Sequence, residues 1–431
     1  MGAALVAFAS LALLALHLFG DKDTAPGGAP PVGPVPAGAP VRIGVLHSRT
    51  GTMAISERGV IDAVLLAVEE VNARGGVLGR PLEPVVEDGQ SDDDVFSAAA
   101  EKLITRHKVV TIFGCWTSAS RKAVKPVVER HDNLLMYSVE SEGMELSPNI
   151  VYGGAAPNQQ ILPAVRWCVG FLNKKRWFLV GSDCLFPRAA NAIVNDEAKT
   201  LGCQVVGEEY LLQGTTDVAG VIEKIRAAQP DLIINTLNGD TNVPFFRGLR
   251  RAKITPERVP TISFTIDDTE LAGLPAKDLV GDLVAGNYFE ELERPQNRAF
   301  VAAFHKRYGA QRSISDSMQT AYYSVHVWAE AVQAAGSVEP PAILAALKGR
   351  RFEAPQGTIR IDPDTLYTVQ HVRIGRFRLG ADNSAHVEEV FVSPRPVPPE
   401  PFPSSRSRQA WEGFLGDLQR QWHGRWANPG P

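Results

Sequence analysis

Four polar segments of the sequence each follow a short apolar run and carry the side chains best suited to bind a ligand. They are 113–120 (FGCWTSAS), 137–143 (YSVESEG), 181–187 (GSDCLFP) and 235–241 (NTLNGDT). In open α/β sheets, ligands bind beyond the carboxyl ends of the strands, where such loops lie. Hydroxyls, carboxylates and the free N–H groups of helix starts can hold the polar atoms of a small solute. Together the four segments predict a binding cleft.

Each of these side chains also has a plain structural interpretation. Ser118 fits the N-cap of a helix as well as a ligand contact, because both roles use the same residue types. Glu140 and Glu142 also fit charges on a solvated loop, and Asp183 is expected to face the same cleft. The prediction of a site therefore depends on the four loops together.

Signatures of catalysis are missing from the sequence. It has no GxxxxGK[ST], no GxGxxG after the first strand, and no HExxH, GxSxG or CxxC. The nine histidines are scattered, and the acidic run 92–94 fits a helix cap. We expect no catalytic residue, no metal and no cofactor. An amidohydrolase with Cys184 as nucleophile is the weakest alternative, since no histidine is near it in sequence.

The elements that must position these loops alternate between strand and helix. Short apolar runs predict strands, and stretches of helical periodicity separate them, including one capped by Ser56 and one over 92–106. This alternation is typical of parallel sheets in βαβ units. It is too long for one sheet, so we expect two α/β lobes with crossovers near 155–158 and 286–287.

Composition limits the class of protein further. The 431 residues carry 44 Lys+Arg and 48 Asp+Glu, a net charge of 44 − 48 = −4, and 44% are hydrophobic. This indicates a folded chain of several domains without the basic face that nucleic acid requires. The four cysteines are expected to be reduced thiols, with a Cys184–Cys203 disulfide left open.

Both ends of the sequence differ from its body. Residues 1–20 contain an apolar run that fits a signal peptide or a single membrane anchor, and 21–40 form a Pro/Gly/Ala-rich linker. At the other end, 394–431 is an extension that opens on a Pro-rich run. Within it, 407–426 predicts an amphipathic helix, which either docks on the body or binds a membrane or a partner.

Long stretches of this sequence resemble a known family. They are 47–89, 113–129, 147–165, 178–183, 235–246, 287–289 (NYF) and 354–363 (APQGTIRIDP). The chain resembles the type I periplasmic solute-binding proteins, which include the leucine-binding proteins, and specifically the branch that binds urea and short-chain amides for ABC importers. The resemblance runs from Val41 to Pro403.

The resemblance implies a two-lobed α/β fold with parallel sheets flanked by helices and a hinge of three crossovers that closes on the ligand. We assign 41–157 and 287–345 to lobe 1, and 158–286 and 346–393 to lobe 2. It further implies a periplasmic or other extracytoplasmic binding protein that captures a small solute and delivers it to ABC permease subunits. A membrane-tethered sensor for a regulatory partner is the alternative.

The resemblance also carries over residues of the ligand site. Ser118 is similar to the hydroxyl that contacts the amide, Tyr137 to a pocket-wall tyrosine, and Thr265 to a contact from lobe 2. The full set of expected ligand-binding residues is Trp116, Thr117, Ser118, Tyr137, Val139, Glu140, Asp183, Cys184 and Thr265.

Two departures from the family pattern alter the expected ligand. The loop after Tyr137 reads Ser-Val-Glu140-Ser141 before Glu142-Gly, where the family typically has a Pro and then Gln-Tyr, and Cys184 replaces a tyrosine that closes the pocket. Lost aromatic rings enlarge the pocket, and Glu140 adds a negative charge. We therefore expect a ligand other than urea, an amine or an amino-acid-like molecule that pairs with Glu140.

Overall fold

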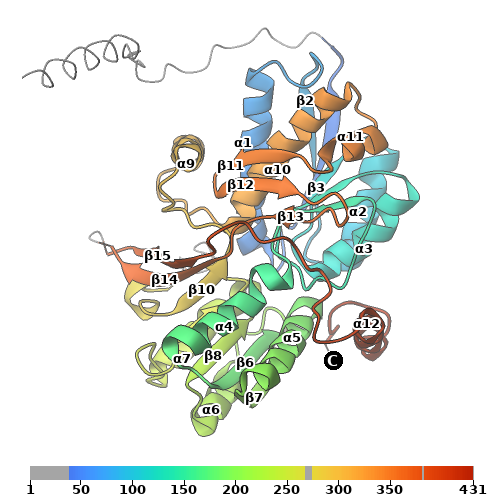
Figure 1. Cartoon of the computed structure of the whole chain (residues 1–431). Coiled ribbons are helices and arrows are strands. Elements are labelled where there is room, and N and C mark those ends of the chain that lie inside the picture. Colours follow the sequence, from blue (N-terminus) through green and yellow to red (C-terminus); the bar gives the residue numbers. More distant parts are fainter. Residues whose placement is uncertain (1–37, 267–273, 381–382, 431) are drawn as a thin grey trace, which may run out of the picture.

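The chain folds into two α/β lobes, one above the other in Figure 1. This computed structural model describes residues 38–266, 274–380 and 383–430. The residues expected to form the signal peptide or anchor, and nearly all of the linker, lie outside these ranges. No helix in the described ranges is both long enough and apolar enough to cross a membrane.

Lobe 1 is built on a five-stranded parallel sheet in the order β2-β1-β3-β4-β5. Its strands are β1 (Val41–His47), β2 (Leu82–Asp88), β3 (Ile112–Gly114), β4 (Leu135–Tyr137) and β5 (Ile150–Tyr152). The helices of this lobe are α1 (Ala54–Ala73), α2 (Asp93–Thr105), α3 (Ser118–Arg130), α9 (Pro295–Tyr308), α10 (Asp316–Ala335) and α11 (Pro340–Leu347). Because helices cover both faces of a parallel sheet, β3, β4 and β5 are fully buried, whereas the edge strand β2 (LEPVVED) is only partly buried and carries acidic residues.

Lobe 2 contains a seven-stranded mixed sheet in the order β15-β14-β10-β9-β8-β6-β7. Its strands are β6 (Arg176–Ser182), β7 (Gln204–Leu211), β8 (Leu232–Thr236), β9 (Thr261–Ser263), β10 (Leu283–Gly286), β14 (Arg373–Leu379) and β15 (Ala385–Val392). Its helices are α4 (Ile161–Leu172), α5 (Leu185–Leu201), α6 (Ala219–Ala228) and α7 (Asn242–Arg251). The strands β14 and β15 run antiparallel at one edge.

Two helix starts differ in their capping. As expected, Asp92 caps α2, and its carboxylate accepts hydrogen bonds from the N–H groups of Asp94 and Val95. The prediction that Ser56 caps α1 is wrong, because α1 begins two residues earlier and Met53 occupies the cap position without a side-chain hydrogen bond. The apolar periodicity correctly predicts the helix. It does not predict the first turn, because the path of the preceding loop determines where the helix begins.

The chain passes between the lobes at 153–160, 287–294 and 370–372. Buried amide side chains hold these crossovers together. Gln160 Nε2 donates to the carbonyls of Phe264 and Ala285, both at 2.8 Å. Asn287 Nδ2 donates to the carbonyl of His371 at 2.6 Å. The expected hinge of three crossovers is therefore present, and its backbone groups are satisfied by side chains.

The division of the chain between the lobes differs from the sequence assignment in one segment. Residues 346–393 were assigned to lobe 2, yet β11 (Arg351–Ala354), β12 (Gly357–Ile361) and β13 (Thr368–Val369) form a separate small sheet. Ile359, Ile361 and Tyr367 pack into the core of lobe 1. Only β14 and β15 join lobe 2. Strand periodicity cannot tell which of two sheets a strand will cover.

The C-terminal extension contains the expected helix, α12 (Arg408–Gln421), which lies beside α5 in Figure 1. Trp411, Leu415, Leu418 and Trp422 are buried in the core of lobe 2. The indole of Trp411 donates to the carbonyl of Pro403 at 2.8 Å. The structure therefore shows the docked alternative for this helix.

A docked α12 should contribute to the stability of lobe 2. We expect Trp411→Ala to lower the free energy of unfolding by about 3–5 kcal/mol, because it removes a fully buried indole and leaves a cavity. Urea denaturation measures this difference. Glu412→Ala, on the exposed face of the same helix, should change stability by less than about 0.5 kcal/mol. Equal effects of the two variants would contradict docking.

Candidate functional site

The carboxyl end of β3 leads into α3 and presents the first group of predicted site residues. Thr117 is the N-cap of α3, and its hydroxyl oxygen accepts from the N–H of Ser120 at 3.0 Å. Ser118, the next residue, has its hydroxyl directed inward to the carboxylate of Glu142. The capping role that the sequence allowed for Ser118 belongs to Thr117 instead.

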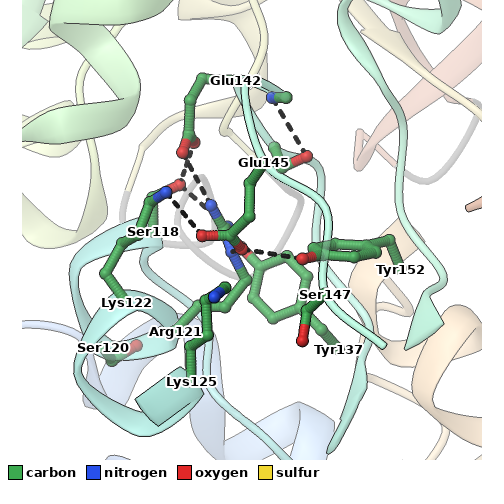
Figure 2. A network of polar contacts seen from close by, with 12 residues as sticks. Ser118, Ser120, Arg121, Lys122, Lys125, Tyr137, Glu142, Glu145, Ser147 and Tyr152 are labelled. Atoms are coloured by element: carbon green, nitrogen blue, oxygen red, sulfur yellow. Dashed lines mark hydrogen bonds and ion pairs between the residues drawn. The ribbon is translucent and has the colours of Figure 1, made fainter. Parts of the chain in front are cut away.

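A buried ion-pair network lies directly behind this helix start (Figure 2). Arg121 is fully buried, and its Nη2 donates to Glu142 Oε1 at 2.7 Å while its Nε donates to Glu145 Oε1 at 3.0 Å. Its Nη1 donates to Ser118 Oγ at 3.1 Å. Lys122 Nζ lies 2.5 Å from the second oxygen of Glu145. A buried guanidinium is tolerated only with such complete pairing.

The network also shifts the proton affinities of its members. Burial alone would raise the pKa of Glu145, but the positive charges of Arg121 and Lys122 outweigh it and lower the pKa to about 2. The carboxylate remains ionised at any physiological pH. The guanidinium carbon of Arg121 lies 4.8 Å from the centroid of the Tyr137 ring. This cation–π contact and the ion pairs together hold the loop 138–147 against α3.

A small cavity lies between the lobes, next to the crossovers. It offers about 60 Å³ of space to water-sized molecules, room for only a few waters. Trp116 and Glu140 reach it from lobe 1, and the aromatic rings of Phe264, Tyr288 and Phe289 form much of its wall. Gln160, Thr265, Ile266, Glu290, Ile314 and Asp316 are among the other lining residues.

Carboxyl groups dominate the polar lining of this cavity. Glu140, Glu290 and Asp316 all line it, whereas no Lys, Arg or His is found among its described lining residues. Burial raises the pKa of Asp316 to about 6, against the opposing hydrogen bond from the N–H of Asn287 at 2.6 Å. Burial raises the pKa of Glu290 as well. The cavity is therefore suited to a positive charge or to several hydrogen-bond donors.

One hydrogen-bond donor complements these acceptors. The indole of Trp116 is 95% buried, and its Nε1 has no hydrogen-bond partner among the described residues. A buried N–H without a partner costs free energy unless a ligand or water accepts its proton. The site can thus hold a small molecule with donors at one end and an acceptor at the other.

The predicted site residues fall into three groups in the structure. Trp116, Glu140 and Thr265 line the cavity. Thr117, Ser118, Tyr137 and Val139 lie at the same edge of lobe 1 but do not line it, and the hydroxyl of Tyr137 donates to the carbonyl of Trp116 at 2.8 Å. Asp183 and Cys184 lie at the β6–α5 loop, also away from the lining.

Asp183 and Cys184 are already engaged by other parts of the chain. Asp183 pairs with Arg188 at 2.6 Å and accepts from Asn428 Nδ2 at 2.7 Å. Cys184 is buried, and burial raises the pKa of its thiol far above the usual range. Its described side-chain partner is Asn238 at 3.6 Å, not a histidine. A thiol in this environment is not activated as a nucleophile, which argues against the amidohydrolase alternative.

Sequence reasoning missed several residues that the fold brings to the site. The aromatic pair Tyr288–Phe289 and Glu290 belong to the second crossover, and Asp316 begins α10 beyond it. The motif 287–289 (NYF) beside the expected crossover is a sequence signal that could have identified the two rings. No sequence pattern indicates Asp316 as a site residue, because it fits the acidic residue commonly found in the first turn of a helix, here α10.

All four cysteines are free thiols, so the expectation of reduced thiols is confirmed. In the described part of the chain, no three His, Cys, Asp or Glu side chains are grouped to hold a metal ion.

Two α/β lobes joined by three crossovers, with a small polar cavity between them, are the architecture of a hinged binding protein. The comparisons with known proteins agree. The model of the periplasmic binding protein domain family matches residues 41–408, and the chain belongs to this family. The two-lobed type I fold expected from the sequence is confirmed.

Individual relatives are distant. The Leu/Ile/Val-binding protein homolog 6 of Brucella melitensis is 23% identical over 360 residues, which span 81% of this chain and 90% of the relative. A solute-binding protein of R. palustris, solved with 4-hydroxybenzoate, has a TM-score of 0.76 at 22% identity and covers 84% of this chain and 98% of its own.

The branched-chain amino acid binding protein of Streptococcus pneumoniae, solved with isoleucine, has a TM-score of 0.72 at 19% identity. It covers 81% of this chain and 99% of its own. None of the three proteins named here is presented as a urea-binding protein or a sensor, so the expected urea or amide specificity is not confirmed and the sensor alternative is not favoured.

The ion-pair network should be a large contributor to the stability of lobe 1. We expect Arg121→Met to lower the free energy of unfolding by about 3–5 kcal/mol, because it leaves the buried carboxylate of Glu142 without its cation. Denaturant unfolding measures this change. Arg130→Met removes the exposed pair with Glu101 from the same helix and should cost less than about 1 kcal/mol. A cost for Arg121→Met as small as that of the control would show that the network is not structural.

Proposed function

We propose that this protein is the extracytoplasmic solute-binding component of an ABC importer and that its ligand is a small molecule with an amino group. The cavity between the lobes is the binding site, and the lobes close around the ligand at the hinge before delivering it to the permease. The observation that carries the proposal is the acidic lining of that cavity.

The charge of the lining favours a cation over an anion. A carboxylate ligand placed beside Glu140, Glu290 and Asp316 would meet like charges in a confined site between the lobes. An ammonium group would instead pair with them and donate up to three hydrogen bonds. Amines, amino acids and, more weakly, neutral amides therefore fit this lining, whereas simple aromatic acids do not.

The second polar feature of the cavity restricts the ligand further. The indole N–H of Trp116 needs an acceptor, such as a carbonyl or carboxylate oxygen. A ligand with an amino group at one end and such an oxygen at the other would satisfy both features. The small free volume indicates either a compact ligand or a larger one admitted by further opening at the hinge.

A thermal-shift screen tests the ligand class. We expect short primary amines or amino acids to raise the melting temperature, and 4-hydroxybenzoate to leave it unchanged, because only ligands that bind the folded state stabilise it. Glu140→Gln should weaken amine binding about tenfold by removing one negative charge. Glu293→Gln, an exposed residue outside the cavity, is the matched control. Stabilisation by the aromatic acid alone would refute the proposal.

Binding of an amine should also depend on pH. Because the pKa of Asp316 is about 6, above its ordinary value of 3.8, its carboxyl gains a proton as the pH falls through 6. The ammonium pairs with the ionised form, so affinity should rise between pH 5 and pH 7 and change little above that. Calorimetry with the best amine from the screen measures this dependence.

The Asp316→Asn variant should show a flatter pH profile, while Asp364→Asn, in an exposed turn, should keep that of the wild type. Affinity that falls from pH 5 to pH 7 would contradict pairing with Asp316.

A further inference from the structure

The segment that follows α12 returns to the β6–α5 loop of lobe 2. The N–H of Leu185 donates to the carbonyl of Trp426 at 3.0 Å, and the N–H of Asn428 donates to the carbonyl of Asp183 at 2.9 Å. Between these two bonds, Cys184 and Ala427 form an antiparallel bridge. The segment is thus attached to lobe 2 as a short strand-like addition.

The same segment reaches lobe 1. The ammonium of Lys122, on α3, lies 5.3 Å from the centroid of the Trp426 ring, within the range of a cation–π interaction. Arg425 Nη2 lies 3.7 Å from a carboxylate oxygen of Asp94, at the start of α2. Residues 425–428 therefore contact both lobes.

The charges at the start of α2 favour this contact. Three consecutive aspartates, 92–94, lie there. Burial and repulsion from its two neighbours raise the pKa of Asp93 to about 6, and the positive charge of Arg425 acts in the opposite direction. The positive charge of Arg425 thus offsets part of the negative charge of the three aspartates. This attraction favours the contact between the segment and lobe 1.

The position of the segment relates it to the opening of the cleft. It contacts Asp183 and Cys184 in the β6–α5 loop, where Asn428 Nδ2 donates to Asp183 Oδ2. The lobes cannot move apart at this edge while Trp426 remains on Lys122 and its backbone remains on Leu185.

We propose that residues 424–428 are a strap that joins the two lobes at the edge between α3 and α5 and slows the opening of the cleft. Each of its contacts with lobe 1 is weak, but the docking of α12 on lobe 2 keeps the strap close to its target, so its effective concentration there is high. The importance of the strap for ligand exchange rests on the proposed binding function; its effect on opening does not.

Cys184 offers a direct measure of the strap, because it is buried and its backbone forms a β-bridge with Ala427. We expect a chain that ends at His423, which keeps α12 and Trp422, to show alkylation of the Cys184 thiol at least tenfold faster than the full chain. Peptide mass spectrometry reads each cysteine separately. Cys168, buried in the core of lobe 2 away from the strap, should keep its slow rate.

Point variants distinguish the loss of strap contacts from a general loosening of lobe 2. Trp426→Ala removes the cation–π contact and should accelerate Cys184 labelling in the same direction, by a smaller factor. Arg420→Ala, an exposed residue of α12 that pairs only with Asp417 in the described contacts, should leave the rate unchanged. If truncation also accelerates the alkylation of Cys168, the fold of lobe 2 itself has loosened. The labelling rate of Cys184 in Trp426→Ala then decides whether the strap slows opening.

X-ray scattering of the ligand-free protein provides a second readout. Removal of the strap should raise the radius of gyration, because the lobes then separate more often. Unchanged Cys184 labelling in both strap variants, or unchanged scattering after truncation, would overturn the proposal. Neither measurement needs a ligand. Failure of every amine to bind would therefore refute the proposed ligand class without affecting the proposal that the strap slows opening.

Discussion

The structure depends most on one buried charge, the guanidinium of Arg121. A positive charge with no access to water must be paired completely, and Glu142 and Glu145 supply the pairing from the loop after β4. This requirement ties that loop to α3. The loop in turn holds the C-terminal chain, because the N–H of Met144 donates to the carbonyl of Pro401 at 2.7 Å, an approach that Gly143 permits with φ +67° and no side chain.

The same constraint explains why Ser118 is not available as the primary ligand contact. Its hydroxyl completes the pairing around Arg121 instead of facing the cavity. In the proposed binding site, recognition instead falls to groups that line the cavity, the indole of Trp116 and the carboxyls of Glu140 and Asp316. A rigid wall built from ion pairs thus lies behind the cavity that these groups line.

The two sides of the cleft differ in what covers them. On the side of the crossovers, buried amides such as Gln160 satisfy the backbone and leave a small acidic cavity. On the side of the β6–α5 loop, the C-terminal extension covers Asp183 and Cys184. The extension also contacts lobe 1 through Trp426 and Arg425, so it connects the two lobes in addition to the three crossovers.

The sequence by itself determined the class of fold, the two lobes, the crossovers and the amphipathic helix in the extension, because apolar periodicity and strand–helix alternation are local properties. It also placed Trp116, Glu140 and Thr265 in the cavity wall. Only the tertiary structure decided that 351–369 packs on lobe 1 and that Asp316 joins the site. Those outcomes depend on which distant surfaces meet and on where a buried charge finds its partners, and spacing along the chain encodes neither.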